Sequence, residues 1–463
     1  MGVAVSGWEL ANAVAAEGQL GVVSGTALDA VFARRLLRGD PGGHMRRALE
    51  AFPIPGVADR LVDRYFVEGG TPVGIRLKTK PMPTLKLSRH LRELLIAANF
   101  VEVYLAKEGH PNAVGINYLE KLQIPTLPSL YGAMLAGVDY VLMGAGIPRT
   151  IPAILDRLAE SREVELRIDV KGGEDRFNHF DPAELSAEPL PPVKRPAFLA
   201  IVSSHILATM FAKKVEARVD GFVIEAPTAG GHNAPPRGRL ELTGEGEPRY
   251  GERDVPDLEV IRELGLPFWL AGSWAEPERL KEALELGAAG IQVGTAFAYC
   301  EESGFETDIK RQVLKMSQDN QARVFTDPIA SPTGFPFKVV QMEDTISTDE
   351  MYAERTRTCD LGYLRSAYER DDGSIGWRCA SEPIDDFLEK GGTLEETVGR
   401  KCLCNALMAN VGLGQTQREG YVEPRLVTSG DDVAHVARFL RPGADTYRAS
   451  DVLDYLLPER LTQ

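Results

Sequence analysis

The stretch Leu266–Phe297, LPFWLAGSWAEPERLKEALELGAAGIQVGTAF, decides the fold class because a strand, a helix and a second strand follow one another within it. The apolar run Pro267–Ser273 predicts the first strand, buried on both faces. Ser273 and Glu276 have the S-x-x-E spacing of a capping box, which predicts that a helix begins there. The run Ala289–Thr295 predicts the second strand, so the stretch forms one complete βαβ unit.

The same rhythm of apolar run and helical pattern extends over most of the chain. Continuous apolar runs without alternation indicate parallel strands covered by helices, as in a (β/α)8 barrel or a doubly wound sheet. With the two runs above there are seven such strands, one fewer than a TIM barrel needs. We therefore expect a TIM barrel whose first strand is missing from this chain, or whose place is filled by something else. The five further runs are Leu20–Gly25, Ala113–Leu119, Asp139–Gly146, Phe198–Ser204 and Asp220–Ala226.

Two segments fall outside this repeat. Residues 26–112 contain the runs PVGIRL and FVEVYL around a helical pattern, which predicts an α/β insertion. After about Phe325 the apolar strand runs no longer recur, and charged helical patterns follow. The expected organisation is a barrel over 1–325, which includes the insertion, and a mainly helical C-terminal extension over 326–463.

Composition narrows the class of partner. The 463 residues carry 52 Lys and Arg against 67 Asp and Glu, a formal charge of −15, which disfavours nucleic acid and anionic lipid as partners. No run approaches the roughly 20 apolar residues that span a bilayer, and five cysteines in a long chain argue against a secreted disulfide framework. The expectation is a cytoplasmic protein that acts on a small molecule.

The candidate site residues follow the predicted strands, because the site of a parallel barrel lies at the carboxyl ends of its strands. Gly272-Ser273 and Gly294-Thr295 end the last two strands, and their amides could hold a phosphate. Glu225 ends an earlier strand, and the loop after it contains His232, whose imidazole could take a proton near neutral pH.

These motifs resemble the nitronate monooxygenase (2-nitropropane dioxygenase-like) family, which is related to FMN-dependent enoyl-acyl carrier protein reductases. The resemblance runs through MGVAVSG, LGVVSG, VGIN, GAGIP, TAGGHNAPPRG, LAGS and IQVGTAF. It implies an FMN-binding TIM barrel that oxidises alkyl nitronates, or nitroalkanes, with O2 to a carbonyl compound and nitrite. It also implies that His232 is the catalytic base. The residues implied around the flavin are Met1, Gly2, Val3, Asn117, Glu225, Gly230 and Gly231, and those implied on its phosphate side are Gly272, Ser273, Gln292, Gly294 and Thr295.

The chain departs from the family pattern at two of these positions. Thr228 stands where the family has an acidic residue before its AGGH or SGGH, and Ser273 replaces the second glycine of AGG. Two other functions stay open: an FMN-dependent enoyl-thioester reductase that uses NAD(P)H, with the same barrel and a histidine in the same position, and a non-catalytic scaffold that binds flavin or phosphate. A homodimer is also left open.

Four cysteines gather in the predicted extension, at Cys359, Cys379, Cys402 and Cys404. Four thiolates can bind zinc or an iron–sulfur cluster, but the spacing is not that of a paired C-x-x-C site. Buried, reduced cysteines are the simpler interpretation.

Overall fold

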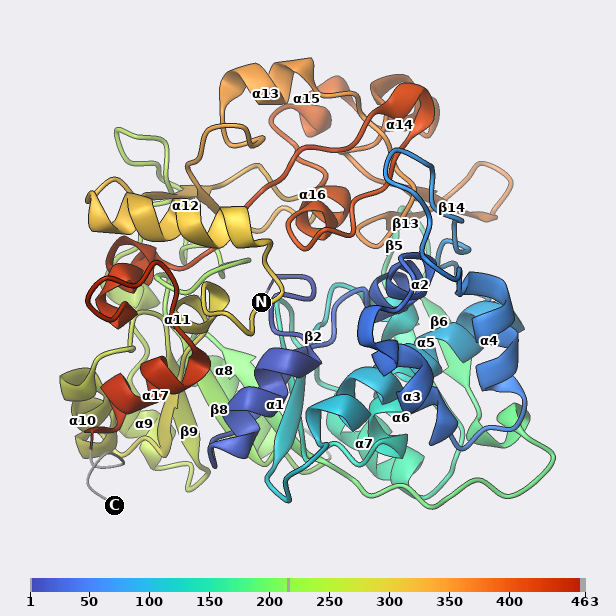
Figure 1. The fold of residues 1–463 in the computed structure, drawn as a ribbon, viewed down its shortest axis with the longest axis horizontal. Helices are drawn as coiled ribbons and strands as arrows, with labels where there is room; N and C mark the ends of the chain where they lie inside the picture. The colour runs from blue at the N-terminus through green and yellow to red at the C-terminus, as the bar shows by residue number, and fades with distance from the viewer. Residues whose placement is uncertain (1, 215–216, 459–463) are drawn as a thin grey trace.

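The computed structural model describes residues 2–214 and 217–458, and its centre is a curled, seven-stranded parallel sheet (Figure 1). The strands follow one another in the order β1-β2-β3-β7-β8-β9-β10, and each of the seven predicted runs forms one of them. The predicted class, an α/β barrel, is therefore confirmed. The strands are β1 Gly21–Ser24, β2 Val114–Leu119, β3 Tyr140–Gly144, β7 Ala197–Val202, β8 Gly221–Glu225, β9 Phe268–Ala271 and β10 Gly290–Gln292.

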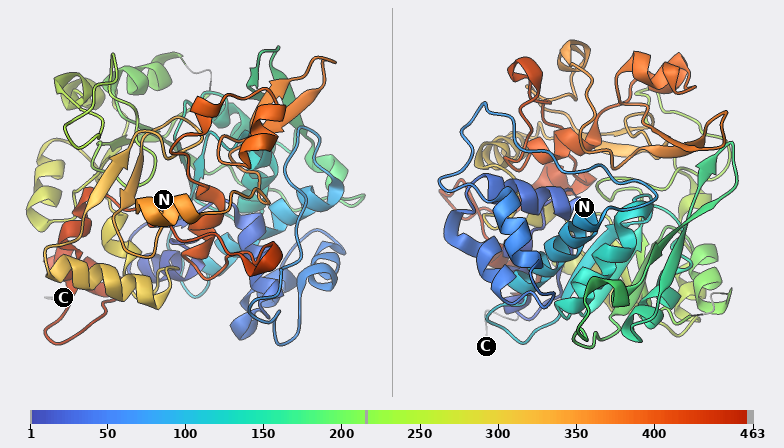
Figure 2. Two further views of the ribbon diagram at one scale, coloured as in Figure 1. Left: turned by 90° about the horizontal axis from the view of Figure 1, so that it is seen from above. Right: turned by 90° about the vertical axis from the view of Figure 1, so that its right-hand side faces the viewer.

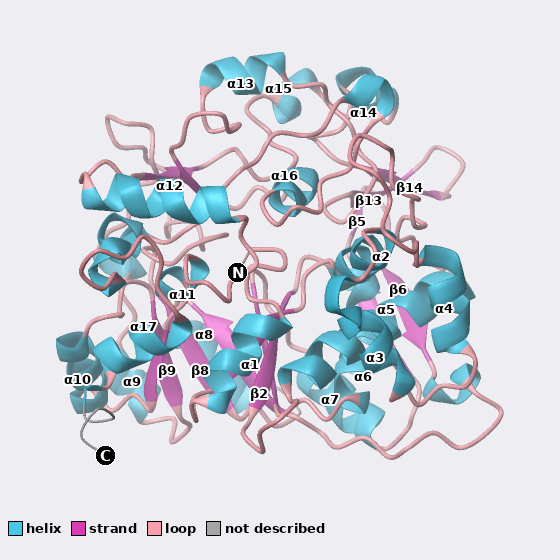
Figure 3. Cartoon of the chain, viewed as in Figure 1, coloured by secondary structure: helices cyan, strands magenta, loops and turns pink. Residues whose placement is uncertain are grey.

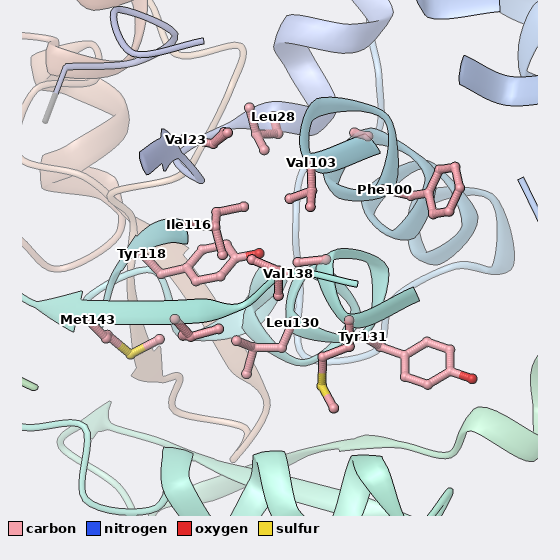
Figure 4. Close-up of a cluster of buried hydrophobic side chains, with 14 of the residues drawn as sticks. Val23, Leu28, Phe100, Val103, Ile116, Tyr118, Leu130, Tyr131, Val138 and Met143 are labelled. Carbon is pink, nitrogen blue, oxygen red and sulfur yellow. The ribbon is translucent and has the colours of Figure 1, made fainter. Parts of the chain in front are cut away.

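Helices cover the outer face of this sheet, as the continuous apolar strands require. They are α1 Trp8–Ala16, α5 Arg89–Ala106, α6 Gln123–Leu135, α7 Ile151–Ala159, α8 His205–Lys214, α9 Leu258–Arg262 and α10 Pro277–Glu285. The largest buried cluster lies between α5, α6 and the first strands, where Phe100, Val103, Ile116 and Leu130 are shielded from solvent (Figure 4). Each such side chain contributes roughly 1.5–3 kcal/mol when it leaves water, so this layer anchors the barrel.

The insertion over 26–112 contains helices and no strand, so the α/β expectation for it was wrong. The run PVGIRL lies in an irregular segment, and FVEVYL lies inside α5. Almost every residue of that run is buried on an 18-residue helix, and a short apolar run cannot by itself distinguish a buried helix from a buried strand. The remaining helices of the insertion are α2 Leu28–Leu37, α3 His44–Glu50 and α4 Val57–Tyr65.

The C-terminal extension mixes short helices with β-hairpins, so it is less helical than expected. Most of it lies across the carboxyl ends of the barrel strands, in orange in Figures 1 and 2, while its last helix, in red, lies at the side of the sheet next to α1. Much loop separates its elements (Figure 3). The small sheets pair β11 Val324–Asp327 with β12 Phe337–Val340, β13 Ser366–Glu369 with β14 Ile375–Arg378 and β5 Val170–Lys171, and β4 Val164–Ile168 with β6 Arg176–Phe180. The helices after the barrel are α11 Thr295–Ala298, α12 Thr307–Gln318, α13 Asp349–Glu354, α14 Ile384–Glu389, α15 Leu394–Thr397, α16 Leu403–Ala409 and α17 Ala449–Leu456.

The sheet does not close into a complete barrel. In the described part of the chain β1 and β10 are its two edges, with no pairing between them. Helices α1 and α17 contact each other outside this opening. Within the same residues, every helix is too short or too polar to cross a bilayer.

Candidate active site

One cavity of about 600 Å³ lies at the carboxyl ends of the strands and brings the predicted site residues together. Met1 lies outside the described residues. The others that line the cavity are Gly2, Val3, Asn117, Glu225, Gly230, Gly231, His232, Gly272, Ser273, Gln292, Gly294 and Thr295.

His232 sits in the loop after β8 and is held by the C-terminal extension. Its Nε2 lies 2.7 Å from Oγ of the fully buried Ser331, and its ring packs edge-on against Phe337 with 4.8 Å between ring centroids. Burial lowers the pKa of His232 to about 3, so the imidazole is neutral at ordinary pH. A neutral imidazole can accept a proton, and the hydrogen bond to Ser331 fixes which ring nitrogen is free to do so.

Glu225, the last residue of β8, lines the same cavity. Burial raises the pKa of its carboxyl group to about 7. The side chain therefore exchanges a proton in the pH range where enzymes commonly work, which is the property of a candidate general acid or base.

A loop of the extension, Thr428–Gly430, closes against the glycine loop that carries His232. The amide of Gly231 donates to Thr428 Oγ1 at 3.1 Å, and the amide of Gly430 donates to Thr295 Oγ1 at 2.9 Å. A Cβ on Gly230 would lie 2.7 Å from the amide nitrogen of Gly430, so this approach requires glycine. Thr428–Gly430 also lines the cavity, but the sequence did not predict that this loop belongs to the site. Its short polar sequence, TSG, indicates a turn and lies outside the barrel motifs.

The residues of the predicted phosphate cradle line the same cavity, although Ser273 does not begin a helix. Helix α10 begins at Pro277, and the side chain of its N-cap residue, Glu276, accepts no hydrogen bond from the first turn. The expected capping box is therefore absent. Ser273 instead adopts a left-handed conformation with φ of +56°, which costs a non-glycine residue about 1 kcal/mol. Its buried Oγ has no hydrogen-bond partner among the described residues, and a Cβ on Gly294 would point into open space. The Ser273 hydroxyl, which has no partner, and the open space at Gly294 together fit a bound phosphate.

The four cysteines of the extension border a second, much smaller cavity, and Cys404 also lines the main one. The described residues contain no group of three or more His, Cys, Asp or Glu arranged to hold a metal ion, so the structure does not support the metal interpretation. Burial raises the pKa of Cys359, Cys379 and Cys402 to about 12, which keeps these thiols protonated.

Comparison with known proteins gives matches to part of the chain. The family model for nitronate monooxygenase matches residues 184–331. A nitronate monooxygenase of Pseudomonas aeruginosa is 35% identical over 91 residues, which are 19% of this chain and 23% of that protein. A (3aS,4S,5R,7aS)-5-hydroxy-7a-methyl-1-oxo-octahydro-1H-indene-4-carboxyl-CoA dehydrogenase of Mycobacterium tuberculosis is 28% identical over 145 residues, 31% of this chain and 36% of that protein. The matched segments thus span about a quarter to a third of these relatives.

Two solved structures align along almost the whole chain at 15% identity. Nitroalkane oxidase from Streptomyces ansochromogenes has a TM-score of 0.48, with 100% of this chain and 94% of that chain covered. FabK from Thermotoga maritima has a TM-score of 0.46, with 99% and 90% covered.

Proposed function

We infer that this chain, which carries a nitronate monooxygenase family region over residues 184–331, is a flavin-dependent oxidoreductase. We further propose that it oxidises alkyl nitronates with O2 to a carbonyl compound and nitrite. The observation that carries the proposal is the single cavity in which His232 and Glu225 face the same space as the candidate phosphate cradle. The proposed cofactor is FMN, which would take electrons from the substrate and pass them to O2 when bound.

The cavity residues divide into two groups around such a cofactor. The Ser273 hydroxyl and the open surface of Gly294 would hold the phosphate, because the first has no other partner and the second leaves room. Asn117 and the Gly230-Gly231 backbone line the cavity beside His232, and would contact the ring. The mostly uncharged lining limits the entry of water to the reacting atoms.

His232 would remove the α-proton from a neutral nitroalkane. For the ring to accept a proton at Nδ1, Nε2 must carry the hydrogen and donate it to Ser331 Oγ, which lies 2.7 Å away. The amide of Thr333 also donates to this oxygen, at 3.3 Å. In that tautomer Ser331 would hold the ring and Nδ1 would be the base. A preformed nitronate has already lost this proton and does not need the step.

Nitrite release under air tests the proposed reaction. The purified protein, loaded with FMN, should release nitrite from a preformed alkyl nitronate and consume O2 in proportion. A protein that binds FMN but releases no nitrite from any alkyl nitronate would contradict the proposed reaction while leaving the flavin assignment intact. Failure to retain FMN at all would contradict both.

The second candidate function is reduction of an enoyl thioester by NAD(P)H. It is favoured by the similarity to a CoA-thioester dehydrogenase and by the apolar side chains that line much of the cavity. Anaerobic titration separates the two functions. Bleaching of the bound flavin by a nitronate but not by NADPH supports the first, and rapid bleaching by NADPH that an enoyl thioester reverses supports the second.

A further inference from the structure

The C-terminal extension gives the main cavity an apolar wall that begins beside His232. The ring of Phe337 packs against the His232 ring, as described above. Phe337 and Leu403 belong to one buried apolar cluster, and Leu364 and Leu407 pack against that cluster. All four of these apolar side chains line the cavity. The wall therefore leads from the candidate base into the extension.

Helix α16 places two of these leucines on one face. Leu403 and Leu407 are four residues apart, so their side chains lie one above the other on the helix. The helix lies above the carboxyl ends of the barrel strands (Figure 1). Leu407 is only partly buried although it packs against an apolar cluster, and the surface that it leaves uncovered borders the cavity.

The barrel continues the same wall at the end of β2. Leu119 is the last residue of this strand, and the alternation of a strand puts it on the same face as Asn117, which lines the cavity. Leu119 and Leu407 pack against one apolar cluster, of which Leu122 is a buried member. Barrel and extension thus border one apolar space, which we call the tail pocket. Its residues are Leu119, Leu122, Phe337, Leu364, Leu403 and Leu407.

The tail pocket offers no partner for a charged group. Among the described residues that line the main cavity there is no lysine and no arginine. The hydroxyl of Tyr363 donates to the buried carboxylate of Asp29, so the ring of Tyr363 is what borders the cavity. Burial holds the pKa of the Cys404 thiol well above its usual value, so this group is neutral. An anionic group placed here would lose its hydration and gain no countercharge.

We propose that the tail pocket binds the alkyl chain of the substrate, and that the enzyme prefers nitronates with a longer, uncharged chain to those that end in a carboxylate. This inference rests on the proposed function and names the class of nitronate for it. With the reacting carbon beside His232, the chain would follow Phe337 toward α16. The extension would then set the substrate specificity, while the barrel loops supply the reaction.

The length and charge of the substrate test the pocket first. Nitrite release by the FMN-loaded protein should give a kcat/KM that rises by about three- to fourfold for each methylene added from ethyl to hexyl nitronate, as expected for methylenes that leave water. A butyl nitronate whose chain ends in a carboxylate should give a value about tenfold or more below that of butyl nitronate, because its charge finds no partner. A kcat/KM that is independent of chain length, or that is equal with and without the carboxylate, would overturn the proposal.

Two variants at Leu407 place the chain in the pocket. Leu407→Trp fills the space, so kcat/KM for hexyl nitronate should fall by about tenfold while the value for ethyl nitronate stays within about twofold of the parent. Leu407→Lys supplies a positive charge and should raise the value for the carboxylate-ended nitronate. The matched controls are Leu394→Trp and Leu394→Lys, at a leucine of α15 that is 55% exposed and does not line the main cavity. Equal losses at every chain length, in a Leu407 variant that retains FMN, would contradict the assignment of the chain to this pocket.

Binding without turnover separates this inference from the proposed reaction. In calorimetric titration of the protein as purified, 1-octanol should bind saturably, octanoate should bind about tenfold more weakly or not at all, and Leu407→Trp should weaken octanol binding by about tenfold. Such binding without nitrite release from any nitronate would leave the pocket in place and remove the proposed reaction. If octanol does not bind, or binds equally to the parent and to Leu407→Trp, the inference is wrong whether or not nitrite is released.

Discussion

At the scale of single residues, His232 is distinguished by its surroundings rather than by its loop. Its ring is held between Ser331 and Phe337, both from the segment that follows the barrel. The sequence indicated the histidine because a Gly-rich loop followed a predicted strand. It could not indicate Ser331, since the two residues are 99 positions apart and no local pattern connects them.

Replacement of His232 by Ala should separate the two substrates of the proposed reaction. Loss of the base should lower the rate on a neutral nitroalkane by about 100-fold or more, because general base catalysis contributes roughly 10²–10⁴. The rate on a preformed nitronate should fall much less. Steady-state nitrite assays on both substrates measure the difference, and FMN absorbance shows that the cofactor is retained. Equal losses on both substrates would remove His232 from proton transfer.

The titration of Glu225 should make the free energy of unfolding depend on pH. Its pKa is about 7 in the folded protein and lies above the value of 4.5 expected for an exposed glutamate, so the folded state binds the proton more tightly than the unfolded state. The stabilisation from this group is then complete below pH 4.5 and is lost as pH rises through 7. Glu225→Gln removes the titrating group. The thermal midpoint of the variant minus that of the parent should therefore increase from pH 5 to pH 8. A constant difference across that range would show that Glu225 is already ionised in the fold.

At the scale of elements, the seven strands could be predicted because each is a short apolar run bounded by glycine or polar residues. The insertion could not, because a short, mainly apolar run such as FVEVYL suits a buried strand as well as a buried helix, and only its packing in α5 decides between them. The capping box at Ser273 failed for a related reason: the loop turns at Gly272 and Ser273, which both have positive φ, and the helix begins only at Pro277. Strand ends were therefore predictable from local pattern, while loop geometry was set by tertiary contacts.

The end of β10 provides a clean test of the phosphate cradle. Gly294 has an ordinary φ of −119°, and a Cβ there meets no atom within 4 Å, so substitution should leave the fold intact. Gly294→Asp would place a carboxylate beside the phosphate and should weaken FMN binding at least tenfold, whereas Gly294→Ala should bind nearly as well as the parent. Fluorescence titration of the apoprotein with FMN measures both affinities. Similar affinity in all three proteins would place the phosphate elsewhere.

At the scale of the whole molecule, the extension completes the site instead of merely covering it. Residues 428–430 lie between the glycine loop after β8 and the start of α11, and hydrogen bonds join them to both. The amide of Asp431 also donates to the carbonyl of Thr228 at 3.0 Å. The backbone of Thr228, and not its side chain, makes this contact. The barrel and the extension should therefore lose their order together when this junction is disturbed.

Gly430→Ala tests that coupling. A Cβ on Gly430 would lie 2.8 Å from the carbonyl oxygen of Thr228 and 2.9 Å from Thr295 Oγ1, so the loop must move away from the barrel. Because the φ of Gly430 is −81°, the cost comes from this crowding and not from backbone conformation, and about 1–3 kcal/mol is expected. Gly244→Ala, with no atom within 4 Å of the added Cβ, is the matched control. In limited proteolysis Gly430→Ala should be cleaved faster within the extension and should also lose FMN, since Thr295 belongs to both contacts. If cleavage accelerates while FMN affinity is unchanged, the extension shields the site without shaping it.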